Sequence, residues 1–212
     1  MKNKIVIIGS GWAGTSLVKH LNCDNFDVTV ISKDLNFIYT PLLTYKSLNN
    51  INLSHPIESV NNIKTIKSYI KLEMIDFNNN SIRIDEQKID YDYLVFTNGA
   101  EINTFNIEGV EKFCYYINNF NIKEIEEINN IYVIGTGPTG TEMIGHLLDY
   151  QKNNNLDFKI VAIDGLKEPV SMIRDNKMII DFWNQNKVSQ YYENFVKKII
   201  NNKIMTTKTS FD

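Results

Sequence analysis

The sequence predicts an α/β protein built from two similar strand–turn–helix modules in series, and a duplicated motif carries this prediction. Residues 5–21, IVIIGSGWAGTSLVKHL, align with residues 131–147, IYVIGTGPTGTEMIGHL, at an offset of 126 residues. Each stretch opens with β-branched residues typical of a buried strand and continues into a helical pattern. Between strand and helix lies G-x-G-x-x-G, the turn of Rossmann-like folds. Both modules are therefore expected to be Rossmann-like.

The three glycines of each turn have separate roles. The first allows a tight turn, the second lets the backbone approach a pyrophosphate, and the third lets the helix pack on the strand. Amide groups at the helix start then face the anion. One such motif is a weak signal, but two in the same context predict two dinucleotide-binding modules. The glycines are Gly9, Gly11 and Gly14 in the first turn and Gly135, Gly137 and Gly140 in the second.

Each module continues into a second strand, whose end lies where a ribose is bound in such folds. KIVAID ends in Asp164, 29 residues after Gly135. The usual offset is about 20, and we attribute the excess to an Asn-rich loop at 152–155. The carboxylate accepts hydrogen bonds from a ribose diol and repels a 2′-phosphate, which favours NAD(H) over NADP(H).

The first module differs at this position. DVTVIS ends in Ser32, 23 residues after Gly9, and a hydroxyl binds a ribose less strongly than a carboxylate. Asp34 could substitute for it, and the neighbouring Lys33 leaves a phosphorylated ribose open.

The remaining elements are predicted from weaker patterns. Residues 36–45 are expected to be extended or turning because Pro41 has a fixed φ and no donor, either against a ligand or as a buried connection. A short helix is expected at 54–63, with Ser54 as its N-cap and Pro56 in its first turn. Strands expected at 69–77, 81–85 and 91–97 form a β-meander returning to the sheet. It ends at Gly99, where a close backbone approach to a ligand is expected.

The second half has fewer signals. An amphipathic helix is expected at 121–130 and another at 176–186, followed by short strands with a turn at 201–202. The module boundaries expected from these patterns are 1–120 and 121–212.

Composition narrows the class of protein. The chain has 212 residues, 43% hydrophobic and 22% charged, as in soluble globular proteins of one or two domains. A net charge of −3 gives no indication of nucleic-acid binding. The first strand begins at Ile5, which leaves no room for a signal or transit peptide before it. Cys23 and Cys114 form no CxxC pair and no metal-ligand spacing is present, so a reducing, cytoplasmic compartment without a metal site is the default expectation.

Several motifs together resemble a known family. GSGWAGTSLVKHL, NFIYTPLL, YDYLVFTNGAEINTFNIEGVEKFCYYI, IYVIGTGPTGTEM and VAID occur in this order. They resemble the type II (alternative, rotenone-insensitive) NADH dehydrogenases, particularly the mitochondrial branch of fungi, plants and protists. More broadly, the chain resembles two-dinucleotide-domain flavoproteins with a three-layer ββα FAD/NAD(P)-binding fold, which include the disulfide reductases. The redox cysteine pair of those reductases is absent here, which argues against thiol chemistry.

The resemblance implies two cofactor sites and one catalytic residue. The first module would bind FAD and the second NADH, and the catalytic residue, Glu142 of G-P-T-G-x-E, would lie near the nicotinamide. His146 stands where the family usually has a second glutamate, four residues after Glu142, so the two side chains could pair. The FAD residues would be Gly9, Gly11, Trp12, Gly14, Ser32, Thr40, Pro41, Leu42 and Gly99, and the NADH residues Gly135, Gly137, Thr139, Gly140 and Asp164.

The implied reaction is hydride transfer from NADH to FAD, followed by electron transfer to a quinone at a membrane surface without proton pumping. The family chain is longer, so the resemblance implies C-terminal truncation and incomplete sheets. We therefore expect that this chain alone binds FAD weakly or not at all, and that it is poorly soluble or depends on a homo-oligomer or a complementing chain. Peripheral membrane contact is expected only if the missing C-terminal part is supplied. Two alternatives stay open: a non-catalytic nucleotide-binding homologue, and a flavin-dependent NADH reductase with another acceptor, such as a sulfide or ferredoxin partner.

Overall fold

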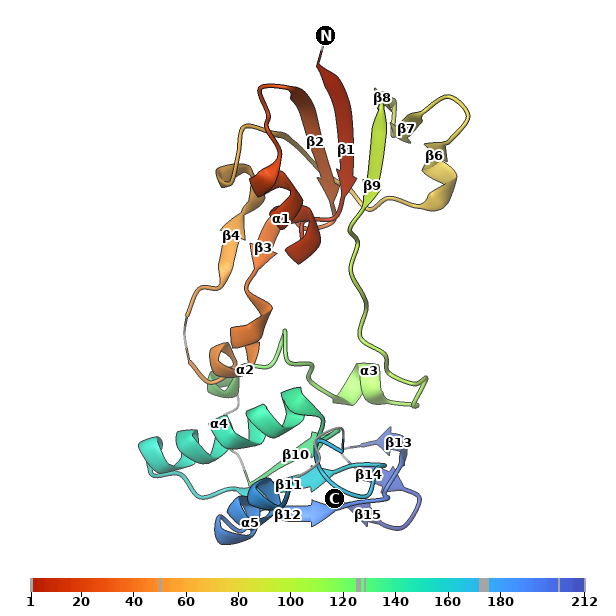
Figure 1. Ribbon diagram of the computed structural model, residues 1–212. Helices are drawn as coiled ribbons and strands as arrows, with labels where there is room; N and C mark the ends of the chain where they lie inside the picture. Colours follow the sequence, from red (N-terminus) through yellow and green to blue (C-terminus); the bar gives the residue numbers. More distant parts are fainter. Residues whose placement is uncertain are drawn as a thin grey trace. The chain divides into compact units, whose positions relative to one another are not determined.

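A computed structural model describes residues 2–49, 51–124, 127, 129–171, 176–201 and 203–211. The chain divides into two compact units (Figure 1). Unit 1 comprises Met1–Thr40 and Leu53–Ile102, and unit 2 comprises Pro41–Asn52 and Asn103–Asp212. This division does not coincide with the expected boundary at residue 120. Residues 41–52 go with unit 2 because Leu48 is buried in its core and the Ser47 carbonyl accepts a hydrogen bond from the Ile122 amide.

Unit 1 is organised around a parallel sheet of four strands in the order β5-β2-β1-β9. A three-stranded antiparallel sheet, β6-β7-β8, and the hairpin β3-β4 complete the unit. The elements are β1 (Asn3–Ile8), α1 (Trp12–His20), β2 (Phe26–Ser32), β3 (Asn36–Ile38), β4 (Ser54–Pro56), β5 (Lys64–Lys67), β6 (Ile75–Asp76), β7 (Ser81–Ile84), β8 (Gln87–Asp90) and β9 (Tyr93–Phe96). Single 3₁₀ turns lie at Ile57–Ser59 and Leu72–Met74.

The two faces of this parallel sheet are covered by different layers. Ile5 and Ile7 of β1 pack with Val18 of α1 on one face. Val6 of β1 and Ile82 of β7 share a second cluster on the other. Side chains alternate along a strand, and a parallel sheet buried on both faces reads as a continuous apolar run, as IVII does. The three-layer ββα arrangement is therefore confirmed for unit 1.

Unit 2 also combines a parallel sheet with an antiparallel sheet, but its parallel sheet has three strands instead of four. Its parallel sheet has the order β10-β11-β12, and its antiparallel sheet has the order β13-β14-β15. The elements are α2 (Leu43–Lys46), α3 (Val110–Phe113), β10 (Asn130–Ile134), α4 (Pro138–Asn154), β11 (Lys159–Ile163), α5 (Lys177–Gln185), β12 (Ser189–Tyr191), β13 (Val196–Ile200), β14 (Lys203–Thr206) and β15 (Ser210–Phe211). A short 3₁₀ turn lies at Ile122–Glu124, and another, Thr40–Leu42, begins at the last residue of the first segment of unit 1 and continues into unit 2.

The core of unit 2 is layered in the same way. Ile160 and Ala162 of β11 pack with Leu147 of α4. Ile163 of the same strand packs with Ile204 of β14 on the opposite face. Both predicted Rossmann-like modules are thus confirmed as α/β units with an antiparallel layer.

Three local predictions need correction. The expected helix at 54–63 is wrong: Ser54–Pro56 is a strand paired with β3, and only Ile57–Ser59 forms a 3₁₀ turn. Helix α4 continues to Asn154, so the late position of Asp164 reflects helix length and not the expected loop. The expected helix at 121–130 is reduced to the turn Ile122–Glu124, while residues 125, 126 and 128 lie outside the described residues and Asn130 begins β10. In the described part of the chain, no helix combines the length and the apolarity that crossing a membrane requires.

Candidate dinucleotide-binding sites

The two glycine turns have the same backbone geometry. The amide of Gly9 donates to the carbonyl of Ile31 at 2.9 Å, and the amide of Gly135 donates to the carbonyl of Ile163 at 2.8 Å. Both first glycines have positive φ, +111° and +89°, which favours glycine. Each turn therefore leaves its first strand and bonds to the end of the second, at the carboxyl edge of the parallel sheet.

The third glycine of each turn is required by packing inside the chain. A Cβ on Gly14 would overlap the carbonyl oxygen of Gly9, well inside the 3.0 Å that real Cβ atoms keep. A Cβ on Gly140 would overlap the carbonyl oxygen of Gly135 in the same way. These two glycines let the helix approach the turn closely, as the motif predicts.

The second glycine of each turn is not required by the chain itself. Among the described residues, no neighbouring atom lies within 4 Å of a Cβ built on Gly11 or on Gly137. Their φ values, −71° and −65°, are open to any residue. The sequence nevertheless places glycine at both positions, and the space that a Cβ would fill is the space a pyrophosphate needs for close backbone approach. The turns thus fit dinucleotide phosphates.

The helix starts also fit an anion. Helix α1 begins after Gly11 and α4 begins after Gly137, neither N-cap has a side-chain hydrogen bond, and neither first turn contains an acidic residue. The first amides of a helix lack intrahelical partners and carry partial positive charge. An anion placed there can receive these hydrogen bonds without competition from a carboxylate in the first helical turn.

The second residue of each turn, which the sequence pattern left unassigned, links the turn to the second strand. Ser10 is 5% exposed, and its Oγ lies 3.0 Å from Oγ of Ser32 and donates to the carbonyl of Asp34. Thr136 is fully buried, and both its amide and its hydroxyl donate to Oδ2 of Asp164, at 2.5 Å and 2.7 Å. The only available sequence signal was a hydroxyl residue at the same place in both motifs.

An aromatic cluster lies beside the first turn. The Trp12 ring packs edge-on against Phe37 at a centroid distance of 5.0 Å and in a tilted arrangement against Tyr39 at 5.3 Å. Its Nε1–H donates to Oγ1 of Thr40 at 2.9 Å. Trp12 is 48% exposed, so part of the ring is open to a ligand. The structure thereby brings the segment after β3 to the glycine turn of unit 1.

Gly99 lies near the same edge of the sheet. Strand β9 pairs with β1 so that Phe96 is opposite Ile8, and the Thr97 hydroxyl is 3.0 Å from the carbonyl oxygens of Ile8 and Gly9. Gly99 follows with φ +68°, a conformation that favours glycine.

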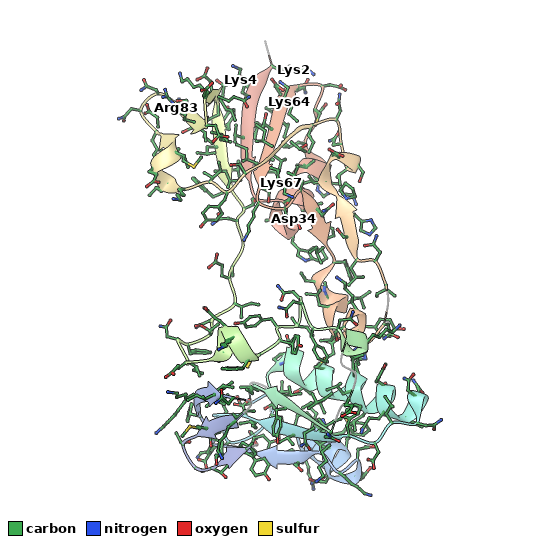
Figure 2. The ribbon with its side chains drawn as sticks, turned by 180° about the vertical axis from the view of Figure 1, so that it is seen from behind. Lys2, Lys4, Asp34, Lys64, Lys67 and Arg83 are labelled. Carbon is green, nitrogen blue, oxygen red and sulfur yellow. The ribbon has the colours of Figure 1, made fainter. Side chains whose placement is uncertain are left out.

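Charged residues of unit 1 lie at two opposite edges of its parallel sheet (Figure 2). Figure 2 shows Asp34 and Lys67 at the carboxyl edge of the parallel sheet, opposite the edge with Lys2 and Lys4. Asp34, the second candidate for a ribose contact, accepts hydrogen bonds on its Oδ1 from the amide and side chain of Asn36.

The remaining predicted residues belong to unit 2. Pro41 and Leu42 are exposed and precede α2, and Thr139 is exposed in the first turn of α4. Glu142 is one turn further along α4, with its Oε1 3.6 Å from Nε2 of His146. The expected i,i+4 pair is therefore confirmed. The His146 ring also packs against Tyr45 at a centroid distance of 5.7 Å.

These geometries agree with a family comparison. The family model described as "Pyridine nucleotide-disulphide oxidoreductase" matches residues 3–211. The chain belongs to the pyridine nucleotide-disulphide oxidoreductase family. The matched residues include both G-x-G-x-x-G turns.

Curated relatives confirm the resemblance stated from the motifs. External alternative NAD(P)H-ubiquinone oxidoreductase B2, mitochondrial, of Arabidopsis thaliana is 32% identical over 192 residues, covering 70% of this chain and 32% of the relative. External NADH-ubiquinone oxidoreductase 2, mitochondrial, of Saccharomyces cerevisiae is 29% identical, covering 81% of this chain and 39% of the relative. The chain thus spans about a third of the length of such relatives.

Solved structures show the same fold. Plasmodium falciparum NDH2 in complex with NADH has a TM-score of 0.79 at 22% identity, covering 96% of this chain and 50% of that chain. Water-forming NADH oxidase from Lactobacillus brevis bound to NADH has a TM-score of 0.80 at 18% identity, covering 100% of this chain and 52% of that chain. At these identities the likeness supports the fold alone.

Proposed function

We propose that this chain forms the two nucleotide-binding units of an FAD-dependent NADH:quinone oxidoreductase, with FAD on unit 1 and NADH on unit 2. The observation that carries the proposal is the open second glycine of both turns, Gly11 and Gly137. No internal contact requires glycine there, so the requirement fits a phosphate group outside the chain. The names of the curated relatives support a nicotinamide dinucleotide as donor, ubiquinone as acceptor and a mitochondrial location.

In unit 1, the proposed FAD site lies at the carboxyl edge of the parallel sheet. The amides at the start of α1, between Gly11 and Gly14, would hold the pyrophosphate, and Ser32 would face the adenosine ribose. Trp12, anchored to Thr40, would cover one side of the cofactor. Gly9 and Gly99 supply the turns that a close backbone approach requires.

In unit 2, the proposed NADH site has the same plan. The amides of Thr139 and Gly140 in the first turn of α4 would bind the pyrophosphate, since Pro138 has no N–H to offer. Asp164 would accept a hydrogen bond from the adenosine ribose. Glu142, half-exposed on α4, would lie near the nicotinamide.

Bound FAD would supply the acceptor for the hydride of NADH and the donor of electrons to the quinone. The chain's own contribution is to bind and orient the two dinucleotides. Gly135 positions the second turn as Gly9 positions the first. This division of labour predicts that losing one turn abolishes turnover while the other unit still binds its nucleotide.

Anaerobic flavin bleaching tests the proposal. With FAD supplied at concentrations that saturate the weak binding expected of this chain, NADH should bleach the flavin absorbance, and a short-chain ubiquinone should restore it. Gly137→Val should prevent bleaching while FAD stays bound. The quinone assignment would be contradicted if ubiquinone failed to restore the flavin absorbance and another acceptor, such as a sulfide or ferredoxin partner, restored it. Binding of both nucleotides without bleaching would instead support a non-catalytic homologue.

A further inference from the structure

The two glycine turns contain matching side-chain links that the G-x-G-x-x-G pattern does not describe. In each turn the residue between the first two glycines is a buried hydroxyl residue bonded to the residue at the end of the second strand. In unit 1 the linked residues are Ser10 and Ser32, two neutral hydroxyls. In unit 2 they are Thr136 and Asp164, a hydroxyl and a carboxylate. The position of the link is shared, and only the link in unit 2 carries charge.

The Asp164 carboxylate is held on both of its oxygens. Oδ2 accepts the amide of Thr136 at 2.5 Å and its hydroxyl at 2.7 Å, while Oδ1 accepts the amide of Leu166 at 2.8 Å. A carboxylate has about four acceptor sites, so these three bonds leave about one, on Oδ1. The carboxylate is only partly buried, so this remaining site can be reached from solvent.

Thr136 is itself immobilised. Its carbonyl accepts the amide of Val170 at 2.8 Å and the hydroxyl of Thr141 at 3.1 Å, and its side chain is fully buried. Rotating Asp164 away from this position would leave the Thr136 hydroxyl buried without an acceptor, which is costly. The Thr136 hydroxyl therefore fixes where the negative charge of Asp164 lies.

The position of that charge matters for which dinucleotide binds. A ribose 2′-hydroxyl can donate to the remaining site on Oδ1, whereas a 2′-phosphate brings negative charge and no donor. A carboxylate that cannot rotate away keeps this repulsion at full strength.

We propose that Thr136 is a positioning residue that sets the preference of unit 2 for a dinucleotide with an unphosphorylated ribose, by locking Asp164. The inference rests on the proposed function of unit 2 as the NADH site. Ser10, at the equivalent position of unit 1, has a neutral partner and has no part in this selection.

Equilibrium binding of NADH and NADPH to the full chain tests the proposal. Thr136→Val keeps the shape and the backbone amide but removes the hydroxyl. It should lower the ratio of the NADPH and NADH dissociation constants by about tenfold or more, from the loss of one hydrogen bond to a charged group. Thr136→Ser restores the donor and should restore the ratio. Asp164→Asn, which removes the charge, should lower the ratio at least as far.

The controls separate positioning from general destabilisation. A merely structural effect of Thr136→Val would weaken both nucleotides equally and leave the ratio unchanged. Ser10→Ala makes the matching deletion in unit 1 and should also leave the ratio unchanged. If the ratio of the NADPH and NADH dissociation constants is unchanged in Thr136→Val but falls in Asp164→Asn, the role proposed for Thr136 is overturned, while the role of Asp164 in the proposed function stands. If the wild-type chain binds neither nucleotide, this inference and the proposed function both fail.

Discussion

Alanine in place of Gly137 or of Gly140 adds one methyl group to the second turn, but the two substitutions should have different effects. Gly137→Ala should weaken NADH binding, whereas Gly140→Ala should lower folding stability. In Gly137→Ala the new Cβ meets no atom within 4 Å, and the extended backbone accepts alanine. The loss of a glycine N-cap and the gain from a less flexible unfolded chain are each within about 1 kcal/mol, so folding stability should change little. The methyl would occupy the pyrophosphate space, and losing one charge-assisted hydrogen bond, about 1.5–3 kcal/mol, predicts at least about tenfold weaker NADH binding.

In Gly140→Ala the same methyl would overlap the carbonyl oxygen of Gly135, so α4 must move away from the turn. Overpacking of this kind costs about 1–3 kcal/mol. For a chain of this size that corresponds to a fall in Tm of about 2–4 °C per kcal/mol. The expected result is a destabilised protein, in contrast to Gly137→Ala.

Thermal unfolding and NADH titration of Gly137→Ala and Gly140→Ala test these two expectations. Gly145→Ala is the matched control: it lies inside α4, its Cβ also meets no atom within 4 Å, and alanine should stabilise the helix by about 0.5–1 kcal/mol. Gly11→Ala and Gly14→Ala repeat the comparison in unit 1 with FAD. The reasoning is refuted if Gly137→Ala binds NADH as tightly as wild type, or unfolds as early as Gly140→Ala.

Three further outcomes are expected. Trp12→Phe keeps a ring beside Phe37 but removes the bond to Thr40, and isothermal titration should show FAD binding weakened about three- to tenfold. Burial, and then the charges of Asp164 and Glu168, raise the pKa of Tyr192. The unfolded chain therefore loses this proton first, so urea unfolding should show stability falling above about pH 10, and less so in Tyr192→Phe. Glu142→Gln should cost under about 1 kcal/mol, because its His146 pair is partly exposed, while stopped-flow flavin reduction by NADH slows.

The elements that the sequence predicted correctly are those in which local pattern and tertiary role agree. The strand–turn–helix stretches combine an apolar run with glycines that the backbone requires, and β1, α1, β10 and α4 form where expected. The β4 segment shows the opposite case. Ser54 and Pro56 resemble a helix start, but pairing of Phe37 with His55 in the β3-β4 hairpin overrides that local preference. Tertiary pairing of this kind leaves no mark in a local pattern.

Two strands were missed because they lack an apolar signature. Strand β5, KTIK, is the outer strand of the parallel sheet, and β8, QKID, is an outer strand of the antiparallel sheet. Edge strands commonly carry charged residues, especially lysine, which discourage pairing with another chain. The polar residues of β5 and β8 follow from the edge position of these strands. They therefore indicate a strand only once the neighbouring strands of the sheet are known.

The links between turn and strand were beyond the motif for a different reason. G-x-G-x-x-G constrains the glycines, whose roles are steric, and leaves x free, so Ser10 and Thr136 have no assigned role in it. The duplication supplies the missing comparison, because the same hydroxyl position faces a neutral partner in one unit and a carboxylate in the other. If both links only held the turn in place, Ser32 and Asp164 could be exchanged without effect. The double variant Ser32→Asp with Asp164→Ser would then leave the nucleotide preference of each unit unchanged. Because charge position decides which ribose is accepted, we expect this exchange to reduce the discrimination of unit 2 against NADPH.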